Sequence, residues 1–226
     1  MSNAETKALT SSPSLSFEQT LWEAGYRTIA GIDEAGRGAL AGPVAAGAVI
    51  LPCQADLLDT LHGVRDSKLM TAHARQTWRE VICQIAVCWA VGFASHAEVD
   101  ALGILPATHL AVYRAIEQLE PTPDYLITDY LILSELELPQ TGLVKGDRRA
   151  LSVAAASILA KTARDQIMLE AGKYYQAYGF EQHKGYGTRQ HRQALARLGS
   201  TPLHRLSFHY TCEDLDELSS ENKDDR

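Results

Sequence analysis

The spacing of apolar residues along the chain predicts alternating strands and helices. Short apolar runs, typical of buried strands, occupy residues 28–32, 44–51, 87–94 and 124–129. Apolar positions at helical spacing predict helices over residues 16–24, 71–85, 106–119, 151–174 and 188–198, with a helical turn at 95–99. Strands dominate early, helices and strands then alternate, and helices end the chain. We therefore expect an α/β domain with a mixed sheet and a helical C-terminal portion.

Local signals refine this outline. Thr71 and Thr188 stand where a helix N-cap is expected. The short connection between the first two strands favours antiparallel pairing. Residues 134–142 are predicted to form a loop. Small residues open the helix over 151–174, which would let it lie close against the sheet.

Length and composition favour one globular domain. The chain has 226 residues, 46% of them hydrophobic, enough to bury a core. We expect a catalytic domain over residues 16–210, a disordered N-terminus over 1–15 that opens with a four-residue expression scar, and an acidic flexible tail over 211–226.

No apolar run approaches the roughly 20 residues that span a bilayer, so no membrane is expected as a partner. Four cysteines without zinc-ligand spacing suggest reduced thiols and a cytoplasmic protein.

The net charge of −7 argues at first against nucleic acid, but its distribution removes the objection. Residues 213–226 hold seven acids and two bases, so about −2 remains for the rest of the chain. Residues 184–205 hold five bases and no acid. A local cationic surface is therefore available.

One stretch combines acids with a glycine-rich turn. Asp33 and Glu34 follow the first apolar run, and Arg37 stands between Gly36 and Gly38. Such a stretch is usually a solvated turn, but it also suits a site for a divalent metal and a phosphate. Strand alternation sends neighbouring side chains to opposite faces, so both acids can share a site only if the strand ends or bulges there.

Two more acids stand at element ends, Asp129 after a buried strand and Asp147 before a long helix. With Asp33 and Glu34 they could converge at one edge of the sheet. Hard cations prefer such oxygen ligands, and two ions about 3.5–4 Å apart can drive phosphodiester hydrolysis. Because no cysteine or histidine cluster competes, Mg²⁺ or Mn²⁺ is expected rather than zinc. Solvated strand-end acids remain the alternative.

Six separated motifs carry a resemblance to a known family. They are GIDEAGRG with LAGPV at 31–38 and 40–44, DSK at 66–68, KGD at 145–147, AAASILAK with RD at 154–161 and 164–165, HKGYGT at 183–188, and HR with SF at 204–208. In this order they closely resemble ribonuclease HII, the type 2 ribonucleases H, over about residues 27–209. The resemblance implies an RNase H-like fold with a five-stranded mixed sheet.

The resemblance also implies an activity. Proteins of this family are endonucleases that cut on the 5′ side of ribonucleotides embedded in DNA duplexes and in RNA–DNA hybrids, leaving 3′-hydroxyl and 5′-phosphate ends. The implied role is ribonucleotide excision repair with a two-metal mechanism, and we expect a monomer. The family's active-site carboxylates match Asp33, Glu34, Asp129 and Asp147. Its substrate-binding positions match Gly36, Arg37 and Gly38 for the 2′-hydroxyl, Tyr186 for the sugar, and Lys68 and Lys184 for the backbone.

Two positions depart from the family pattern, and several roles stay open. Tyr130 follows Asp129 where the family usually has glycine, and Ala39 stands where proline is usual. Asp165 is better explained by an ion pair than as a further metal ligand. His183 and His204 could be structural, contact substrate or move protons. A general hybrid nuclease and a non-catalytic nucleic-acid-binding module remain alternative functions.

Overall fold

The structure is a computed structural model that describes residues 12–54 and 56–209. The expected expression scar lies outside these residues, and so does the expected acidic tail. The expectation that residues 1–15 are disordered is wrong at its end. Leu15 is buried, and the backbone N–H of Ser14 donates to the carbonyl of Arg149 at 3.1 Å.

A five-stranded mixed sheet forms the middle of the molecule. Its order is β3-β2-β1-β4-β5, with β1 antiparallel to β2, β2 antiparallel to β3, and both β1–β4 and β4–β5 parallel. The strands are β1 Ile29–Ala35, β2 Val44–Ile50, β3 Cys88–Ala94, β4 Tyr125–Asp129 and β5 Gln140–Leu143. The expected mixed sheet and the antiparallel first pair are confirmed.

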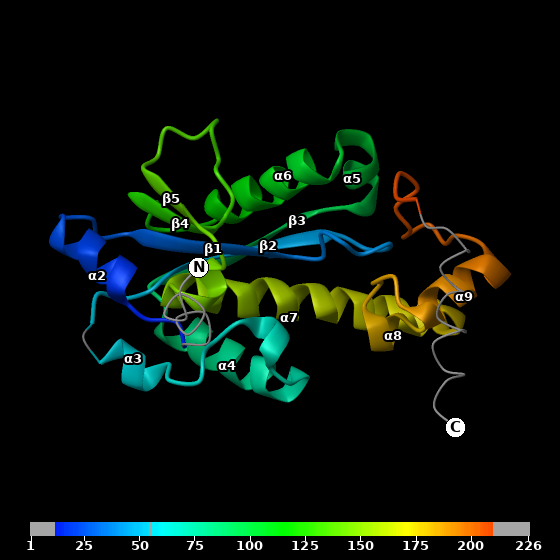
Figure 1. The fold of residues 1–226 in the computed structure, drawn as a ribbon, viewed down its shortest axis with the longest axis horizontal. Coiled ribbons are helices and arrows are strands. Elements are labelled where there is room, and N and C mark those ends of the chain that lie inside the picture. The colour runs from blue at the N-terminus through cyan, green and yellow to red at the C-terminus, as the bar shows by residue number, and fades with distance from the viewer. Residues whose placement is uncertain (1–11, 55, 210–226) are drawn as a thin grey trace, which may run out of the picture.

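Helices cover both faces of this sheet. In Figure 1, α6 and α5 lie above the strands, and α7, α4 and α3 lie below them. Each face has its own core, one centred on α7 and one on α6. The α-helices are α2 Ser16–Glu23, α3 Leu57–Thr60, α4 Ala72–Ile85, α5 His96–Leu102, α6 Ile104–Ile116, α7 Leu151–Tyr174, α8 Phe180–His183 and α9 Arg189–Leu198. The short 3₁₀ helices are η1 Ser67–Leu69, η2 Gly146–Arg148 and η3 Gln176–Tyr178.

The small residues at the start of α7 let it approach the sheet closely, as expected. Ser152 lies so near Gly31 of β1 that a Cβ at this glycine would come within 2.2 Å of the Ser152 carbonyl carbon. A larger residue at either position would push the helix off the sheet. This contact positions the site, because β1 and the residues just before α7 both carry acids.

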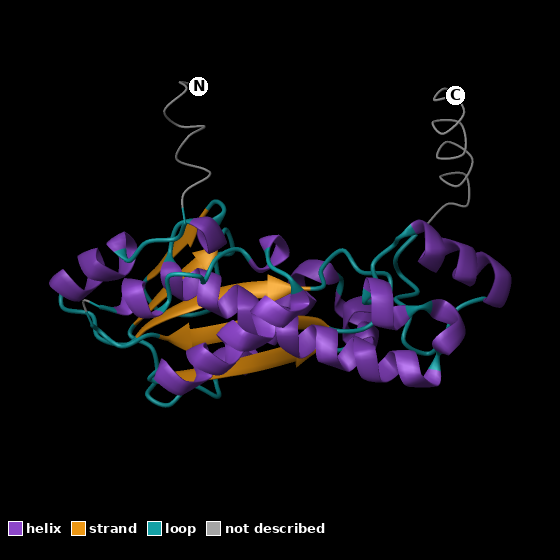
Figure 2. Cartoon of the chain, turned by 90° about the horizontal axis from the view of Figure 1, so that it is seen from below, coloured by secondary structure: helices purple, strands orange, loops and turns teal. Residues whose placement is uncertain are grey.

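The C-terminal elements form a separate small core at the far end of α7. Figure 2 shows α8 and α9 grouped around that end, beyond the sheet. Met168 of α7 and Phe180 of α8 pack there with Leu195 of α9. Thr188 caps α9 by accepting the His191 N–H at 3.3 Å. The expected helical C-terminal portion is confirmed.

Several boundaries differ from the expectations. β1 continues to Ala35, so Asp33 and Glu34 lie within the strand rather than after it. The expected loop over 134–142 ends in β5, a short edge strand paired with β4. α6 begins before Pro106, because proline is tolerated in the first turn, where an N–H has no helical partner. None of the helices in the described ranges is long and apolar enough to cross a membrane.

Candidate active site

Three of the predicted acids meet at one edge of the sheet. Asp33, Asp129 and Asp147 each offer a carboxylate oxygen, and these oxygens all lie within 4.8 Å of one another. Asp33 lies in β1, Asp129 ends the adjacent parallel strand β4, and Asp147 lies in η2, just after β5. Neighbouring parallel strands deliver their carboxyl ends to the same edge, so the topology produces the cluster.

Backbone N–H groups orient two of these carboxylates. The Glu34 N–H donates to Asp33 Oδ1 at 2.7 Å, and the Gly146 N–H donates to Asp129 Oδ1 at 2.7 Å. Lys145, just before Gly146, has a left-handed backbone with φ of 55°. This turn brings Gly146 back to β4 and places Asp147 beside Asp129.

The cluster carries more negative charge than its surroundings balance. Burial raises the pKa of Asp33 well above its usual range, and the charges of Glu34, Asp129 and Asp147 add to the effect. Burial also raises the pKa of Asp147 to about 6, followed by the charges of Asp66 and Asp129. Lys68 opposes both shifts, and its Nζ lies 3.9 Å from Asp147 Oδ2.

This donor set fits a hard divalent cation. It consists of carboxylate oxygens, which Mg²⁺ and Mn²⁺ prefer, and the only cluster of this kind found in the described residues contains no cysteine or histidine. A cation there would offset the burial and the mutual repulsion that raise the pKa values of Asp33 and Asp147. Asp33, Asp129 and Asp147 are therefore the residues that would hold it.

Glu34 does not join the three aspartates. β1 pairs with β2 residue for residue, Asp33 with Gly47 and Glu34 with Ala46, without a bulge. Side chains alternate along a strand, so Glu34 leaves β1 on the other side from Asp33, although, after burial, its charge is still the one that acts most strongly on the pKa of Asp33. Its Oε1 accepts from Arg37 Nη1 at 3.0 Å. Its role as a metal ligand stays a prediction.

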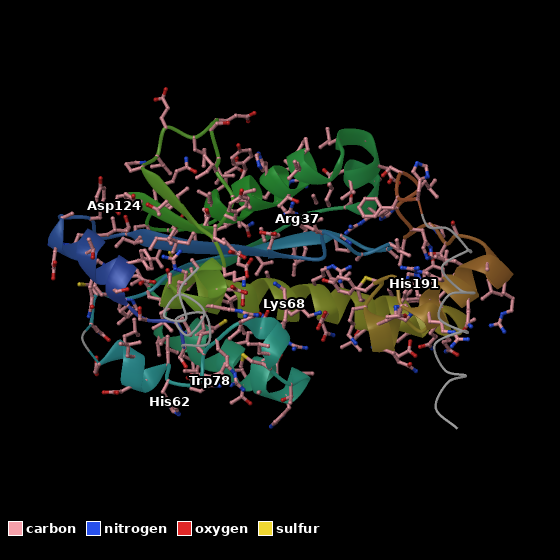
Figure 3. All side chains as sticks on the ribbon, viewed as in Figure 1. Arg37, His62, Lys68, Trp78, Asp124 and His191 are labelled. Atoms are coloured by element: carbon pink, nitrogen blue, oxygen red, sulfur yellow. The ribbon has the colours of Figure 1, made fainter. Side chains whose placement is uncertain are left out.

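A pocket of about 830 Å³ is lined by Glu34 and by Lys68, the lysine beside Asp147, although none of the three aspartates lines it. Five of the predicted substrate-binding residues line it, namely Gly36, Arg37, Gly38, Lys68 and Tyr186. Lys184 does not line this pocket, and its ammonium donates to the Glu181 carbonyl instead. Arg75 and Lys161 line it too and add two cations that were not predicted. Figure 3 labels Lys68 beside α7 in the middle of the molecule.

Two buried arginines join the segments that form this pocket. The Arg164 guanidinium donates to the carbonyls of Pro43, Lys184 and Ala41 at 2.8, 2.9 and 3.0 Å. The Arg205 guanidinium donates to Gly42 and Arg37 carbonyls. Neither arginine forms an ion pair within the described residues, and backbone carbonyl oxygens accept their hydrogen bonds instead. They hold the loop after β1 against the chain around Tyr186.

Arg164 also explains why residue 36 is a glycine. Gly36 has φ of 92°, and a Cβ there would come within 2.0 Å of Arg164 Nε. Arg164 also lies over the Tyr186 ring, with its Cζ 5.1 Å from the ring centroid, and Lys161 Nζ lies 5.4 Å from it. These cations fix the ring by cation–π contact. Sequence reasoning missed Arg164 and Arg205, since nothing local marks an arginine as buried.

A chain of neutral histidines fixes the backbone of Tyr186. His204 Nδ1 accepts the Thr201 N–H at 2.8 Å, so its Nε2 carries the proton and donates to His191 Nε2 at 3.0 Å. His191 Nδ1 then donates to the Tyr186 carbonyl at 3.0 Å. Burial lowers the pKa of His191 to about 4, which keeps the chain neutral. Figure 3 places His191 at the α8–α9 end.

His183 is structural as well. Its Nδ1 accepts the Gly185 N–H at 3.2 Å, and its Nε2 donates to the Tyr178 carbonyl at 2.7 Å. The ring of His183 stacks on that of His191, with centroids 4.4 Å apart. The hydrogen-bonded structural interpretation of His183 and His204 is thus the one that the structure favours.

Two further acids near the site, Asp66 and Asp165, contact positively charged side chains. Asp66 caps η1 by accepting the Lys68 N–H at 2.9 Å, and it accepts from Arg148 Nη2 at 2.9 Å and Nε at 3.1 Å. It thereby joins the segment of Lys68 to that of Asp147. Asp165 forms ion pairs with Lys161 at 2.6 Å and Arg75 at 3.4 Å, so the expected ion pair is confirmed.

Comparisons with known proteins point to one family. The sequence model described as Ribonuclease HII matches residues 30–211. A "Ribonuclease HII" of Roseiflexus castenholzii is 50% identical over 207 residues, which cover 90% of this chain and 91% of that protein.

Solved structures show the same fold. The ribonuclease H2 from Pyrococcus horikoshii OT3 aligns with a TM-score of 0.68 at 22% identity, over 86% of this chain and 100% of that one. Bst-RNase HIII in complex with Mn²⁺ aligns with a TM-score of 0.62 at 18% identity, over 87% and 71% of the two chains. The expected RNase H-like fold is confirmed.

Proposed function

The chain belongs to the ribonuclease HII family, and we propose that it cuts the phosphodiester on the 5′ side of ribonucleotides embedded in DNA duplexes and RNA–DNA hybrids, at the cluster of Asp33, Asp129 and Asp147. One observation carries the proposal. Lys68 lies 3.9 Å from Asp147 of the cluster and also lines the pocket that contains the Gly36–Gly38 loop and Tyr186, so residues suited to hydrolysis and residues suited to binding a sugar are joined through this lysine.

The metal in this proposal is Mg²⁺ or Mn²⁺, two ions being expected with substrate bound. The oxygen-only ligand set supports it, and so does the related RNase HIII that was solved in complex with Mn²⁺. Divalent ions supply an activated water and a counter-charge for the leaving oxygen. The aspartates would hold the ions, and the N–H groups of Glu34 and Gly146 orient the carboxylates of Asp33 and Asp129 for this.

Cations of the pocket position the strand. Lys68 lies beside Asp147, where its ammonium can pair with the phosphate to be cut. Arg75 and Lys161 line the same pocket and can neutralise neighbouring phosphates. Arg37, 42% exposed, is tethered to Glu34 and offers the rest of its planar guanidinium to a phosphate oxygen.

Selection for ribose rests on the 2′-hydroxyl, which both donates and accepts a hydrogen bond. The backbone of the Gly36–Gly38 loop can approach that hydroxyl, because Gly38 has open space where a side chain would be. The Tyr186 ring, held by Arg164 and by the histidine chain, supplies a flat surface for the sugar. Selectivity therefore depends on the alignment of two loops from opposite ends of the chain.

Two finer points belong to the proposal. The three aspartates and the pocket all come from one chain, which supports a monomer as the acting species. Cys53, Cys83 and Cys88 are free thiols, which supports a reducing cytoplasm as the site of action.

A duplex with one embedded ribonucleotide tests this function. Cleavage should require Mg²⁺ or Mn²⁺, leave a 3′-hydroxyl and a 5′-phosphate, and stop in EDTA. Asp33→Asn should abolish cleavage while the circular dichroism spectrum stays unchanged. Asp59→Asn, which changes an exposed acid on α3, is the matched control and should cut normally. Full activity of Asp33→Asn would remove Asp33 from the reaction.

A further inference from the structure

Tyr130 has an unusual conformation for a tyrosine. It directly follows Asp129, has φ of 61°, and its side chain is exposed, with 75% of the residue accessible to water. Its backbone N–H donates to the carbonyl of Leu143 at 2.9 Å, which holds it between β4 and β5. The conformation is thus imposed by the sheet, and a large ring occupies a position that suits glycine.

The fold makes no use of this ring. Within residues 12–54 and 56–209, no hydrogen bond, ring stack or cation–π contact involves the Tyr130 side chain. An exposed tyrosine in a left-handed backbone conformation is strained, and no hydrogen bond, ring stack or cation–π contact of its ring offsets the strain. It also lies one residue from an acid of the cluster. Such features are concentrated at functional sites.

Tyr130 lines a second pocket, of about 340 Å³. Among its other lining residues are Asp129 and Asp147, together with the cations Lys68, Lys145 and Arg148. It shares only Lys68 with the larger pocket that contains Tyr186, so the two pockets flank Lys68.

Lys145 is the available cation of this second pocket. Arg148 is engaged by Asp66 and Lys68 lies beside Asp147, whereas Lys145 is exposed and forms no ion pair within the described ranges. Lys145 also has a left-handed backbone, with φ of 55°. An aromatic ring and an unpaired ammonium therefore stand together beside the acids, as in sites that bind a sugar–phosphate chain.

We propose that Tyr130 and Lys145 form a second nucleotide subsite, in which the ring packs against a sugar and the ammonium pairs with a phosphate of the cleaved strand. The inference rests on the proposed function. If Tyr186 takes the ribonucleotide, which lies on the 3′ side of the cut bond, the pocket across Lys68 takes the nucleotides on the 5′ side. The enzyme then binds the cleaved strand on both sides of the reacting phosphate.

Tyr130→Gly separates this role from a structural one. Glycine accepts the left-handed backbone, so the melting temperature should stay equal or rise. Binding of a duplex with one ribonucleotide, measured by fluorescence anisotropy in EDTA, should weaken about tenfold, within the range for aromatic stacking on nucleic acid. Tyr130→Phe should bind like the wild type. Tyr174→Ala, which removes an exposed ring at the end of α7, is the control and should leave binding unchanged.

Shortened substrates test the assignment to the 5′ side. Removing the cleaved strand upstream of the ribonucleotide should weaken binding of the wild type more than that of Tyr130→Gly, which has only the Lys145 contact left to lose. Removing downstream nucleotides should weaken both equally. Lys145→Asn should lower the slope of log affinity against log salt by about one phosphate contact.

The inference is overturned if Tyr130→Gly binds like the wild type. It is also overturned if Tyr130→Gly binds the substrate without upstream nucleotides as much more weakly than the wild type as it binds the full substrate. Failure of the proposed function would look different, because the wild type itself would then not cut the ribonucleotide-containing duplex.

Discussion

Removing one charge from the acid cluster should stabilise the metal-free protein. Burial and the charges of Asp66 and Asp129 raise the pKa of Asp147 from 3.8 to about 6, so folding disfavours its ionised form at neutral pH. Asp147→Asn removes that charge and keeps the size of the side chain. A substitution that should abolish activity is therefore expected to strengthen the fold.

The size of the effect follows from the raised pKa. A pKa difference of one unit corresponds to about 1.4 kcal/mol. The rise from 3.8 to about 6 thus sets an upper bound of about 3 kcal/mol. In a domain of this size, each kcal/mol shifts the melting temperature by roughly 2–4 °C, so the rise in melting temperature is at most about 12 °C.

The pH dependence has a definite sign. Because the folded-state pKa of Asp147 lies above the unfolded value, the penalty is absent below pH 3.8, grows as the pH rises, and is complete above about 6. The stability advantage of Asp147→Asn should therefore appear between pH 4 and pH 6 and stay constant above that range.

Thermal unfolding in EDTA at several pH values measures this effect. Asp59→Asn is the matched control, since it removes an exposed acid far from the cluster. Added Mn²⁺ should raise the melting temperature of the wild type and of the control, but much less that of Asp147→Asn. The reasoning is refuted if Asp147→Asn melts at or below the wild-type temperature in EDTA at pH 7, or if it keeps the full response to Mn²⁺.

The other predictions concern packing and the histidine chain. Gly31→Ala should lower the free energy of unfolding in urea by about 1–3 kcal/mol, because its Cβ would come within 2.2 Å of Ser152. Gly38→Ala is the control and should change stability far less, since a Cβ there has open space; equal effects of the two substitutions would refute the close approach. His191→Phe should raise KM for a ribonucleotide-containing duplex severalfold, and His191→Asn, which can still donate to the Tyr186 carbonyl, should restore it; a loss of kcat alone would contradict the positioning role. Since burial lowers the pKa of His191 to about 4, wild-type stability should fall as the pH drops from 6.5 towards 4, and this part of the fall should be absent in His191→Phe.

Local patterns predicted the elements whose residues set their own conformation. The bounds of α7 were predicted to the residue, and Thr71 and Thr188 cap their helices as expected, each accepting a backbone N–H. β5 was missed because its four residues, Gln140–Leu143, lack an apolar run and become a strand only through pairing with β4.

The candidate site shows the same difference between features that local sequence predicts and features that only the fold determines. Asp33, Asp129 and Asp147 could be grouped because strand ends converge in a parallel sheet. The position of Glu34 depends on how far β1 extends. The glycines at 36 and 38 suggested that the strand ends before Glu34, and only the pairing with β2 shows that it continues. Contacts between distant segments could not be predicted, because a buried arginine such as Arg164 is recognised only by the carbonyls it meets in the fold.

The central claim is that this site hydrolyses a strand only where a 2′-hydroxyl is presented beside the acid cluster. Two duplexes that differ in one 2′-hydroxyl test it directly, with the cleavage position read at single-nucleotide resolution in Mg²⁺ or Mn²⁺. The account predicts one nick on the 5′ side of the ribonucleotide and an intact all-DNA duplex. Equal cutting of both duplexes, or a nick at another position, would contradict it.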